Sequence, residues 1–224
     1  MERISTARRI LSIFKRPDLS HMRILHLSDI HYCETKQEDF EDFLTKLISE
    51  IKEINQEAKI DFVLITGDLI NKGGSQFIAN KNKPYEFFEQ NVLDPIMNSI
   101  DLSKNQVFIV PGNHDVEDVD PAKDKEEYYL LDQKLKYFND LVVKHRKNTF
   151  GGNERIKKYK EFEKRFYKDY QKKFSPIALS PFESCWVSEF HDLKIGFVAL
   201  NSAWRCSTKL PEDKLYLGVD KQVY

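Results

Sequence analysis

Three short apolar runs, each followed by polar residues, dominate the first half of the chain. They cover residues 23–28 (RILHLS), 62–66 (FVLIT) and 107–110 (VFIV). Runs of this length that are rich in Val, Ile, Leu and Phe are typical of buried strands. Apolar side chains recur at helical spacing over residues 36–55 and 85–100, where Pro95 predicts a bend. The alternation of strand and helix predicts a largely parallel sheet covered by helices.

A charged segment, residues 116–181, interrupts this alternation. It contains two sets of helically spaced aromatic residues separated by Gly151-Gly152, which predicts a helical insertion packed at the edge of the sheet. Within it we expect Phe162 and Phe166 to be buried, and Lys160 and Lys164 to be exposed. Beyond the insertion, residues 185–190 and 193–200 are expected to form two strands joined at His191-Asp192. Thr35 and Glu38 match a helix capping box, and His26, inside the first run, is expected in the core.

Composition limits the partners and the cellular compartment that the sequence predicts. The 224 residues contain 35 Lys and Arg against 36 Asp and Glu, so net charge gives no argument for binding nucleic acid. Residues 157–174 combine basic and aromatic side chains, as a nucleic-acid-binding arm would, but their helical spacing favours an ordinary amphipathic helix. Three widely spaced cysteines and the lack of an apolar run of about 20 residues indicate a cytoplasmic protein without a membrane partner.

The first 21 residues are basic and amphipathic. They are compatible with a transit-like peptide, but Met22 opens the first predicted strand directly, which favours an extension placed ahead of the domain. We therefore predict a basic extension over residues 1–21 and one domain over residues 22–224, with residues 116–181 as its insertion.

The polar residues that end the three predicted strands are suited to holding metal ions. Ligands gather at the C-terminal edge of a parallel sheet, so these residues are expected to lie within a few ångströms of one another. Asp29 and His31 can face one ion, Asp68 has two oxygens with which to bridge two ions, and Asn113 can offer its amide oxygen to the second. Two ions about 4 Å apart activate a hydroxide and hold a phosphoryl oxygen during in-line attack. Cys33 lies two residues beyond His31 and is expected to be a bystander, and Asn201, at the end of the last strand, either faces the site or forms a turn.

At these positions the sequence resembles the calcineurin-like metallophosphoesterase superfamily. The matching motifs are Asp29-Ile30-His31, Gly67-Asp68 and Gly112-Asn113-His114-Asp115, in that order and each at a strand end. The resemblance implies a two-sheet sandwich flanked by helices, and divalent ions (Mn, Fe or Zn, two in a complete site) held by Asp29, His31, Asp68 and Asn113. It also implies that His114 contacts the phosphate or protonates the leaving group, with Asp115 orienting its imidazole. The reaction would be hydrolysis of a phosphomonoester or phosphodiester.

The sequence departs from the family pattern in its second half. The superfamily supplies further histidines there, ending in a Gly-His-x-His motif, whereas the only histidines after His114 are His145 and His191. The chain therefore resembles a family member that lacks its C-terminal part, and whether further domains follow Tyr224 in the natural protein stays open. Two alternatives to a phosphoesterase of unknown substrate stay open: a non-catalytic binding or regulatory module within a larger protein, and a nuclease of the same superfamily.

Overall fold

The computed structural model describes residues 21–79, 83–117, 154–168, 183–204 and 206. Along the chain its strands are β1 (Ile24–Leu27), β2 (Phe62–Thr66), β3 (Val107–Val110), β4 (Glu183–Phe190) and β5 (Leu193–Leu200). Its α-helices are α2 (Gln37–Glu57), α3 (Pro84–Phe88), α4 (Asp94–Ser99) and α7 (Lys157–Phe166). Its short helical turns are η1 (Glu34–Lys36), η2 (Lys72–Gly74), η3 (Glu89–Leu93), η4 (Lys104–Gln106), η5 (Asn113–Asp115) and η6 (Glu154–Ile156).

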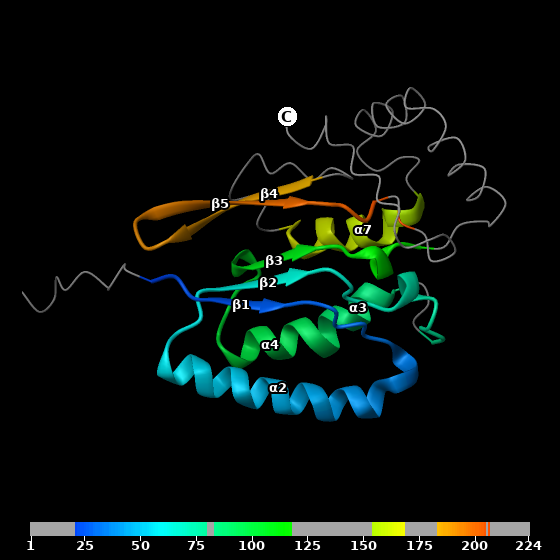
Figure 1. The fold of residues 1–224 in the computed structure, drawn as a ribbon, viewed down its shortest axis with the longest axis horizontal. Helices are drawn as coiled ribbons and strands as arrows, with labels where there is room; N and C mark the ends of the chain where they lie inside the picture. The colour runs from blue at the N-terminus through cyan, green and yellow to red at the C-terminus, as the bar shows by residue number, and fades with distance from the viewer. Residues whose placement is uncertain (1–20, 80–82, 118–153, 169–182, 205, 207–224) are drawn as a thin grey trace, which may run out of the picture.

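The first three strands form a parallel sheet in the order β1-β2-β3, as the sequence predicts. Helices α2, α3 and α4 lie between successive strands in the chain, and in Figure 1 α2 and α4 run beside the sheet on its β1 side. Because all three strands point the same way, the residues after Leu27, Thr66 and Val110 meet at one edge. The α/β class with a parallel sheet and flanking helices is confirmed.

A second, antiparallel sheet consists of the hairpin β4-β5, whose turn lies at His191-Asp192 as predicted. It packs on the first sheet through aromatic rings, with Phe197 stacked on Phe108 at a centroid distance of 3.8 Å and Phe62 5.3 Å from Phe197. This second sheet supplies the other half of the two-layered arrangement that the family resemblance implies.

The helix in which a bend is expected at Pro95 is divided into three parts in the structure. Proline has no N–H to donate, and the helix accommodates it with one wide π turn, η3, between α3 and α4. The expected capping box of Thr35 and Glu38 is wrong: Thr35 lies inside η1, and its hydroxyl contacts Cys33 Sγ. His26 is also misplaced by the sequence argument, because it lies on an edge strand, is exposed, and bonds Thr66 Oγ1 at 2.6 Å.

Helix α7, the described part of the predicted insertion, covers the outer edge of β3 (Figure 1). Tyr159 and Tyr167 donate hydrogen bonds from their hydroxyls to the carbonyls of Ile109 and Val107, at 3.0 and 2.8 Å. These carbonyls belong to the side of β3 that faces away from β2, so the tyrosines satisfy an edge that would otherwise be open. The insertion thus packs at the sheet edge, as predicted, and its remaining residues lie outside the described ranges.

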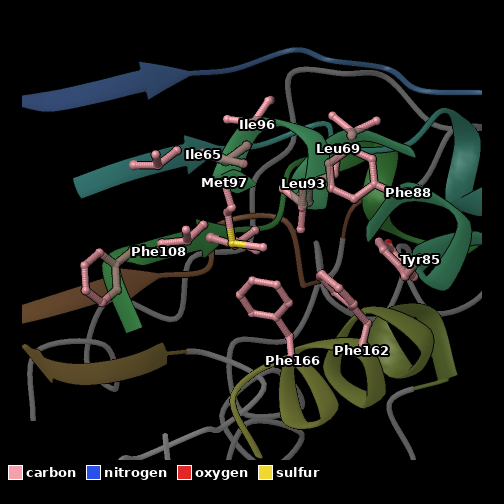
Figure 2. Packing of buried hydrophobic residues seen from close by; sticks show 14 of the residues in the cluster. Ile65, Leu69, Tyr85, Phe88, Leu93, Ile96, Met97, Phe108, Phe162 and Phe166 are labelled. Atoms are coloured by element: carbon pink, nitrogen blue, oxygen red, sulfur yellow. The ribbon is translucent and has the colours of Figure 1, made fainter. Parts of the chain in front are cut away.

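The aromatic side chains of α7 are buried, which confirms the prediction for Phe162 and Phe166. Both rings point at residues of α3 and α4 (Figure 2), and Phe162 stacks on Tyr85 at 5.1 Å. The prediction that Lys160 is exposed is wrong, whereas Lys164 is exposed. Lys160 is only 1% exposed because its ammonium is paired with Glu163 and bonded to Ser184. Among the described residues, no helix is long and apolar enough to cross a membrane.

Candidate metal centre

The loops at the C-terminal edge of the parallel sheet have unusual backbone conformations. Asp29, His31 and Asp68 all have φ near +50°, in the left-handed region that residues with a side chain rarely adopt. These turns are held by backbone hydrogen bonds from His31 N to Asp68 O, at 2.8 Å, and from Tyr32 N to Leu69 O, at 3.0 Å. Three residues in this conformation at one edge represent stored strain, which is found most often at functional sites.

Gly112 lets the loop after β3 approach Asp68 closely. A Cβ atom at this position would lie 2.2 Å from Asp68 Oδ1 and 2.4 Å from Asp68 N. Gly67, at φ +96°, faces Gly112 from the neighbouring strand end. These two glycines therefore permit the close approach of the two loops, and the closer contact is at Gly112.

Three candidate ligands converge at this edge. The potential ligand atoms of His31, Asp68 and His114 all lie within 4.8 Å of one another. Asp68 Oδ2 and Asp29 Oδ1 lie 3.6 and 3.9 Å from His31 Nε2, and the rings of His31 and His114 meet edge to face at 4.5 Å. The predicted convergence is thus confirmed for Asp29, His31 and Asp68, and His114 joins them.

Asp68 and Asp29 differ in their surroundings. The side chain of Asp68 is 11% exposed, and its Oδ1 accepts a hydrogen bond from His114 N at 2.8 Å, while Oδ2 faces His31. The side chain of Asp29 is 70% exposed. One carboxylate is therefore held by the backbone of the next strand end, and the other is open to solvent.

Asn113 is the first residue of the η5 turn and is exposed. Within the described part of the chain its amide makes no hydrogen bond, so its assignment as a ligand stays a prediction. Asn201 is buried, and its Oδ1 accepts a hydrogen bond from Ala203 N at 2.9 Å, which is a turn contact. Cys33 is a buried free thiol next to Thr35.

Asp115 has a different role from the one implied by the resemblance. Its carboxylate accepts hydrogen bonds from the backbone N–H groups of Gly112, Leu69 and Ile70, at 2.8 to 3.2 Å. The Tyr85 hydroxyl donates to its carbonyl at 2.9 Å. The expectation that Asp115 orients the His114 ring is wrong here, because both of its oxygens are engaged with the backbone. It instead ties the loops after β2 and β3 together beneath the candidate ligands.

Burial sets the charge state of this acid. Removal from water raises the pKa of the Asp115 carboxyl to about 7, and the backbone donors from Gly112, Ile70 and Leu69 limit the rise. The same burial, together with the nearby Asp115 charge, holds the pKa of the Tyr85 hydroxyl well above its ordinary value. Asp115 and Tyr85 therefore form a buried, hydrogen-bonded pair beneath the candidate ligands.

Asn71 hydrogen bonds the His114 ring, a contact that was not predicted from the sequence. Its Oδ1 lies 3.0 Å from His114 Nδ1. Its position could have indicated this contact. Asn71 is three residues beyond Asp68 and follows the buried pair Leu69-Ile70, so it is a polar residue near the same edge of the sheet as Asp68.

A pocket of about 240 Å³ opens beside Asp29, between the end of β1 and the helices α2 and α4. Its lining is mostly apolar and includes Leu27, Ile30, Phe40, Phe43, Leu44 and Ile96. Asp29 therefore has the polar ligand cluster on one side and an apolar surface on the other.

The donor set fits a divalent transition metal. Two imidazole nitrogens and one carboxylate oxygen suit zinc, iron or manganese, and three protein ligands that leave a position open are typical of catalytic sites. Asp29, 3.9 Å from His31, is placed to add a fourth ligand.

Comparison with known proteins identifies the family to which this site belongs. The model of the calcineurin-like phosphoesterases matches residues 22–197, so the chain belongs to that family. The protein YydB of Bacillus subtilis (strain 168), described as an uncharacterized metallophosphoesterase-like protein, is 30% identical over 149 residues. That alignment covers 66% of this chain but only 28% of the relative's length. No solved structure matches the chain.

Proposed function

We propose that this chain contributes the metal-binding part of a phosphoesterase site that hydrolyses a phosphomonoester or phosphodiester. The observation that supports the proposal most directly is the convergence of His31, Asp68 and His114 within 4.8 Å at the edge where family motifs meet. A divalent ion bound there supplies Lewis-acid activation of water and of a phosphoryl oxygen. The substrate and activity of a complete protein are part of the proposal, since the chain spans about a quarter of its relative.

Each residue is assigned one task. His31, Asp68 and Asp29 would hold the first ion, and Asn113, with a share of Asp68, would belong to the second. The hydrogen bond from His114 N keeps Asp68 Oδ1 in place, so that Oδ2 is directed to His31. His114 stands at the phosphoryl group and gives a proton to the leaving oxygen. Among the described residues these donors make one good set and not two, so we expect the 224-residue chain to bind one ion weakly and to turn over slowly.

The test compares metal content and turnover of a generic aryl phosphodiester with added manganese. Asp68→Asn should lower metal content and reduce turnover by at least about 100-fold, because the amide has only one oxygen and no charge. Asp61→Asn is the matched control. Asp61 lies at the opposite edge of the sheet, where its Oδ2 accepts a hydrogen bond from Arg23 N at 2.8 Å. Its replacement should change neither metal content nor turnover. Equal loss in both variants, or turnover that does not depend on added metal, would contradict the proposal.

His114→Asn separates two roles of this histidine. If His114 acts at the phosphoryl group, turnover falls while metal content remains near the original value. Loss of the ion in this variant would make His114 a ligand instead, which its distance to His31 and Asp68 also permits.

The aryl probe suits the apolar pocket next to Asp29. We propose that this pocket contacts the organic part of the ester, because it shares Asp29 with the ligand cluster. Phe43→Ser should then raise KM for the aryl substrate several-fold and leave metal content unchanged. Ile54→Ser is the control, since Ile54 is as exposed as Phe43 on the same helix but does not line the pocket. Equal KM values in both variants would remove the pocket from the substrate site.

A further inference from the structure

The hydrogen bond behind His114 determines which ring nitrogen is available. An amide oxygen can only accept, so the contact between Asn71 Oδ1 and His114 Nδ1, at 3.0 Å, requires a proton on Nδ1. The neutral ring then has its lone pair on Nε2, so Nε2 is the nitrogen that can bind a metal ion, or take up a proton and give it to the leaving oxygen.

This assignment holds only while the Asn71 amide keeps its orientation. A rotation of the amide by half a turn would present Nδ2 to His114 and reverse the tautomer. Asn71 Nδ2 donates a hydrogen bond to Gln76 Oε1 at 2.9 Å, and a reversed amide would face this acceptor with a second acceptor. Gln76 therefore opposes the rotation, because a flipped amide would lose its hydrogen bond to Gln76 Oε1.

The backbone holds Gln76 close to Asn71. The η2 turn between them is closed by hydrogen bonds from Gly74 N to Asn71 O, at 3.1 Å, and from Phe77 N to Gly74 O, also at 3.1 Å. Phe77 next to Gln76 is buried. Gly73, at φ +59°, lies so close to the chain after Asp115 that a Cβ would stand 2.5 Å from Val116 O. The turn is thus packed against the segment that bears His114.

We propose that Gln76 is a positioning residue for the site: through Asn71 it holds His114 with its proton on Nδ1 and Nε2 free. The proposal rests on the proposed function for its effect on turnover, but its structural part is independent of any activity. Gln76 touches neither His114 nor the candidate ligands, and its effect passes through the Asn71 amide.

The experiment reads the tautomer directly from imidazole ¹⁵N chemical shifts of the neutral ring in the metal-free chain. Gln76→Met removes the acceptor and keeps an unbranched side chain of similar length. Gln76→Glu keeps an acceptor for Asn71 Nδ2 and is the rescue variant. Asn71→Leu removes the acceptor for the ring itself. Gln106→Met is the matched control, because Gln106 is another half-buried glutamine that hydrogen bonds at the far end of the sheet, to Asp61 O at 3.0 Å.

We expect the original chain, Gln76→Glu and Gln106→Met to show His114 almost wholly in the Nδ1–H form. Gln76→Met and Asn71→Leu should show a mixture of both tautomers. In the aryl phosphodiester assay, Gln76→Met should lower kcat about 10-fold with little change in KM, and Gln76→Glu should restore it.

An unchanged tautomer in Gln76→Met beside a mixture in Asn71→Leu would overturn the role of Gln76. An unchanged tautomer in both would overturn the whole chain of contacts. If Gln76→Met does not fold, a mixture of tautomers in the folded Gln76→Glu would likewise contradict the proposal. Absence of turnover in every variant, with the ¹⁵N result as expected, would count against the proposed function and not against the positioning role.

Discussion

Two clusters of ionisable side chains in this molecule are built in opposite ways. On α7, Lys160 Nζ donates to Glu163 Oε2 at 2.8 Å and to Ser184 Oγ at 3.0 Å, and the Ser184 hydroxyl donates to Glu163 Oε1 at 2.6 Å. Each member of this closed cluster finds its partners inside the cluster and is almost fully buried.

A second cluster, the open cluster, lies at the strand ends and consists of Asp29, His31, Asp68 and His114. Its carboxylates approach the His31 ring without forming good hydrogen bonds to it. His31 Nε2 is 3.6 Å from Asp68 and 3.9 Å from Asp29, both too long for a good hydrogen bond. Asp29, His31 and Asp68 are also held in left-handed backbone conformations. A closed cluster stabilises the packing of a helix on a sheet. An open cluster on a strained backbone leaves its ligand atoms available to bind another group.

The largest effect on stability is expected in the closed cluster. Lys160→Met leaves the carboxylate of Glu163 buried without its counter-ion and should lower the free energy of unfolding by about 3–5 kcal/mol. Lys157→Met, on the same helix, removes only an exposed pair with Glu161 at 3.9 Å and should cost no more than about 0.5 kcal/mol. Urea unfolding measures both, and similar values for the two variants would mean that the closed cluster contributes little to stability.

A glycine pair tests the close packing behind the open cluster. Gly112→Ala should destabilise the chain by about 2–4 kcal/mol and weaken metal binding, because its Cβ would collide with the backbone and carboxylate of Asp68. Gly196→Ala, on β5, has nothing within 4 Å of the added atom and should be neutral or slightly stabilising. Urea unfolding and manganese titration of each variant provide the comparison. A tolerated Gly112→Ala would show that the strand ends are less closely packed than described.

The buried acid beneath the open cluster predicts a pH dependence. The pKa of Asp115 in the folded chain, about 7, lies above its ordinary value of 3.8, so the folded state binds more protons than the unfolded state between these values. This contribution to stability is complete below about pH 4 and is lost as the pH rises through 7. Between pH 4.5 and 7.5, in the presence of a chelator, the original chain should lose about 3 kcal/mol more than Asp115→Asn. Parallel stability curves for the two proteins would rule out this titration.

The smallest effect on stability is expected at Asp29. A substitution in this open cluster should stabilise the metal-free chain, whereas Lys160→Met in the closed cluster should destabilise it. Asp29→Asn removes a charge beside Asp68 and places at φ +54° a residue that tolerates this conformation well. We therefore expect the metal-free chain to gain a few tenths of a kcal/mol while metal affinity falls, the usual trade between stability and function. Thermal unfolding and manganese titration measure the two quantities. Loss of stability in the metal-free variant would mean that Asp29 serves the fold.

The positions of the strands and of the main site residues could be predicted from the sequence because they follow local rules. Apolar runs specify strands, parallel strands bring their ends to one edge, and residues such as Asp29 and Asp68 come directly after such runs. The burial of Lys160 could not be predicted, since it depends on Ser184 from a strand that is distant in sequence. The engagement of Asp115 with the backbone of Leu69 and Ile70 depends likewise on how two loops meet. His26 was expected in the core because a short apolar run does not reveal that its strand lies at a sheet edge.

The central claim, that the strand ends form a metal centre, is tested most directly by calorimetric titration of the 224-residue chain with Mn²⁺. The titration compares the original chain with Asp68→Asn and with Asp61→Asn, which lie at opposite edges of one strand pair. The account predicts a single saturable site in the original chain, the same site in Asp61→Asn, and affinity reduced by at least about 10-fold in Asp68→Asn. Identical titrations for all three proteins would contradict it.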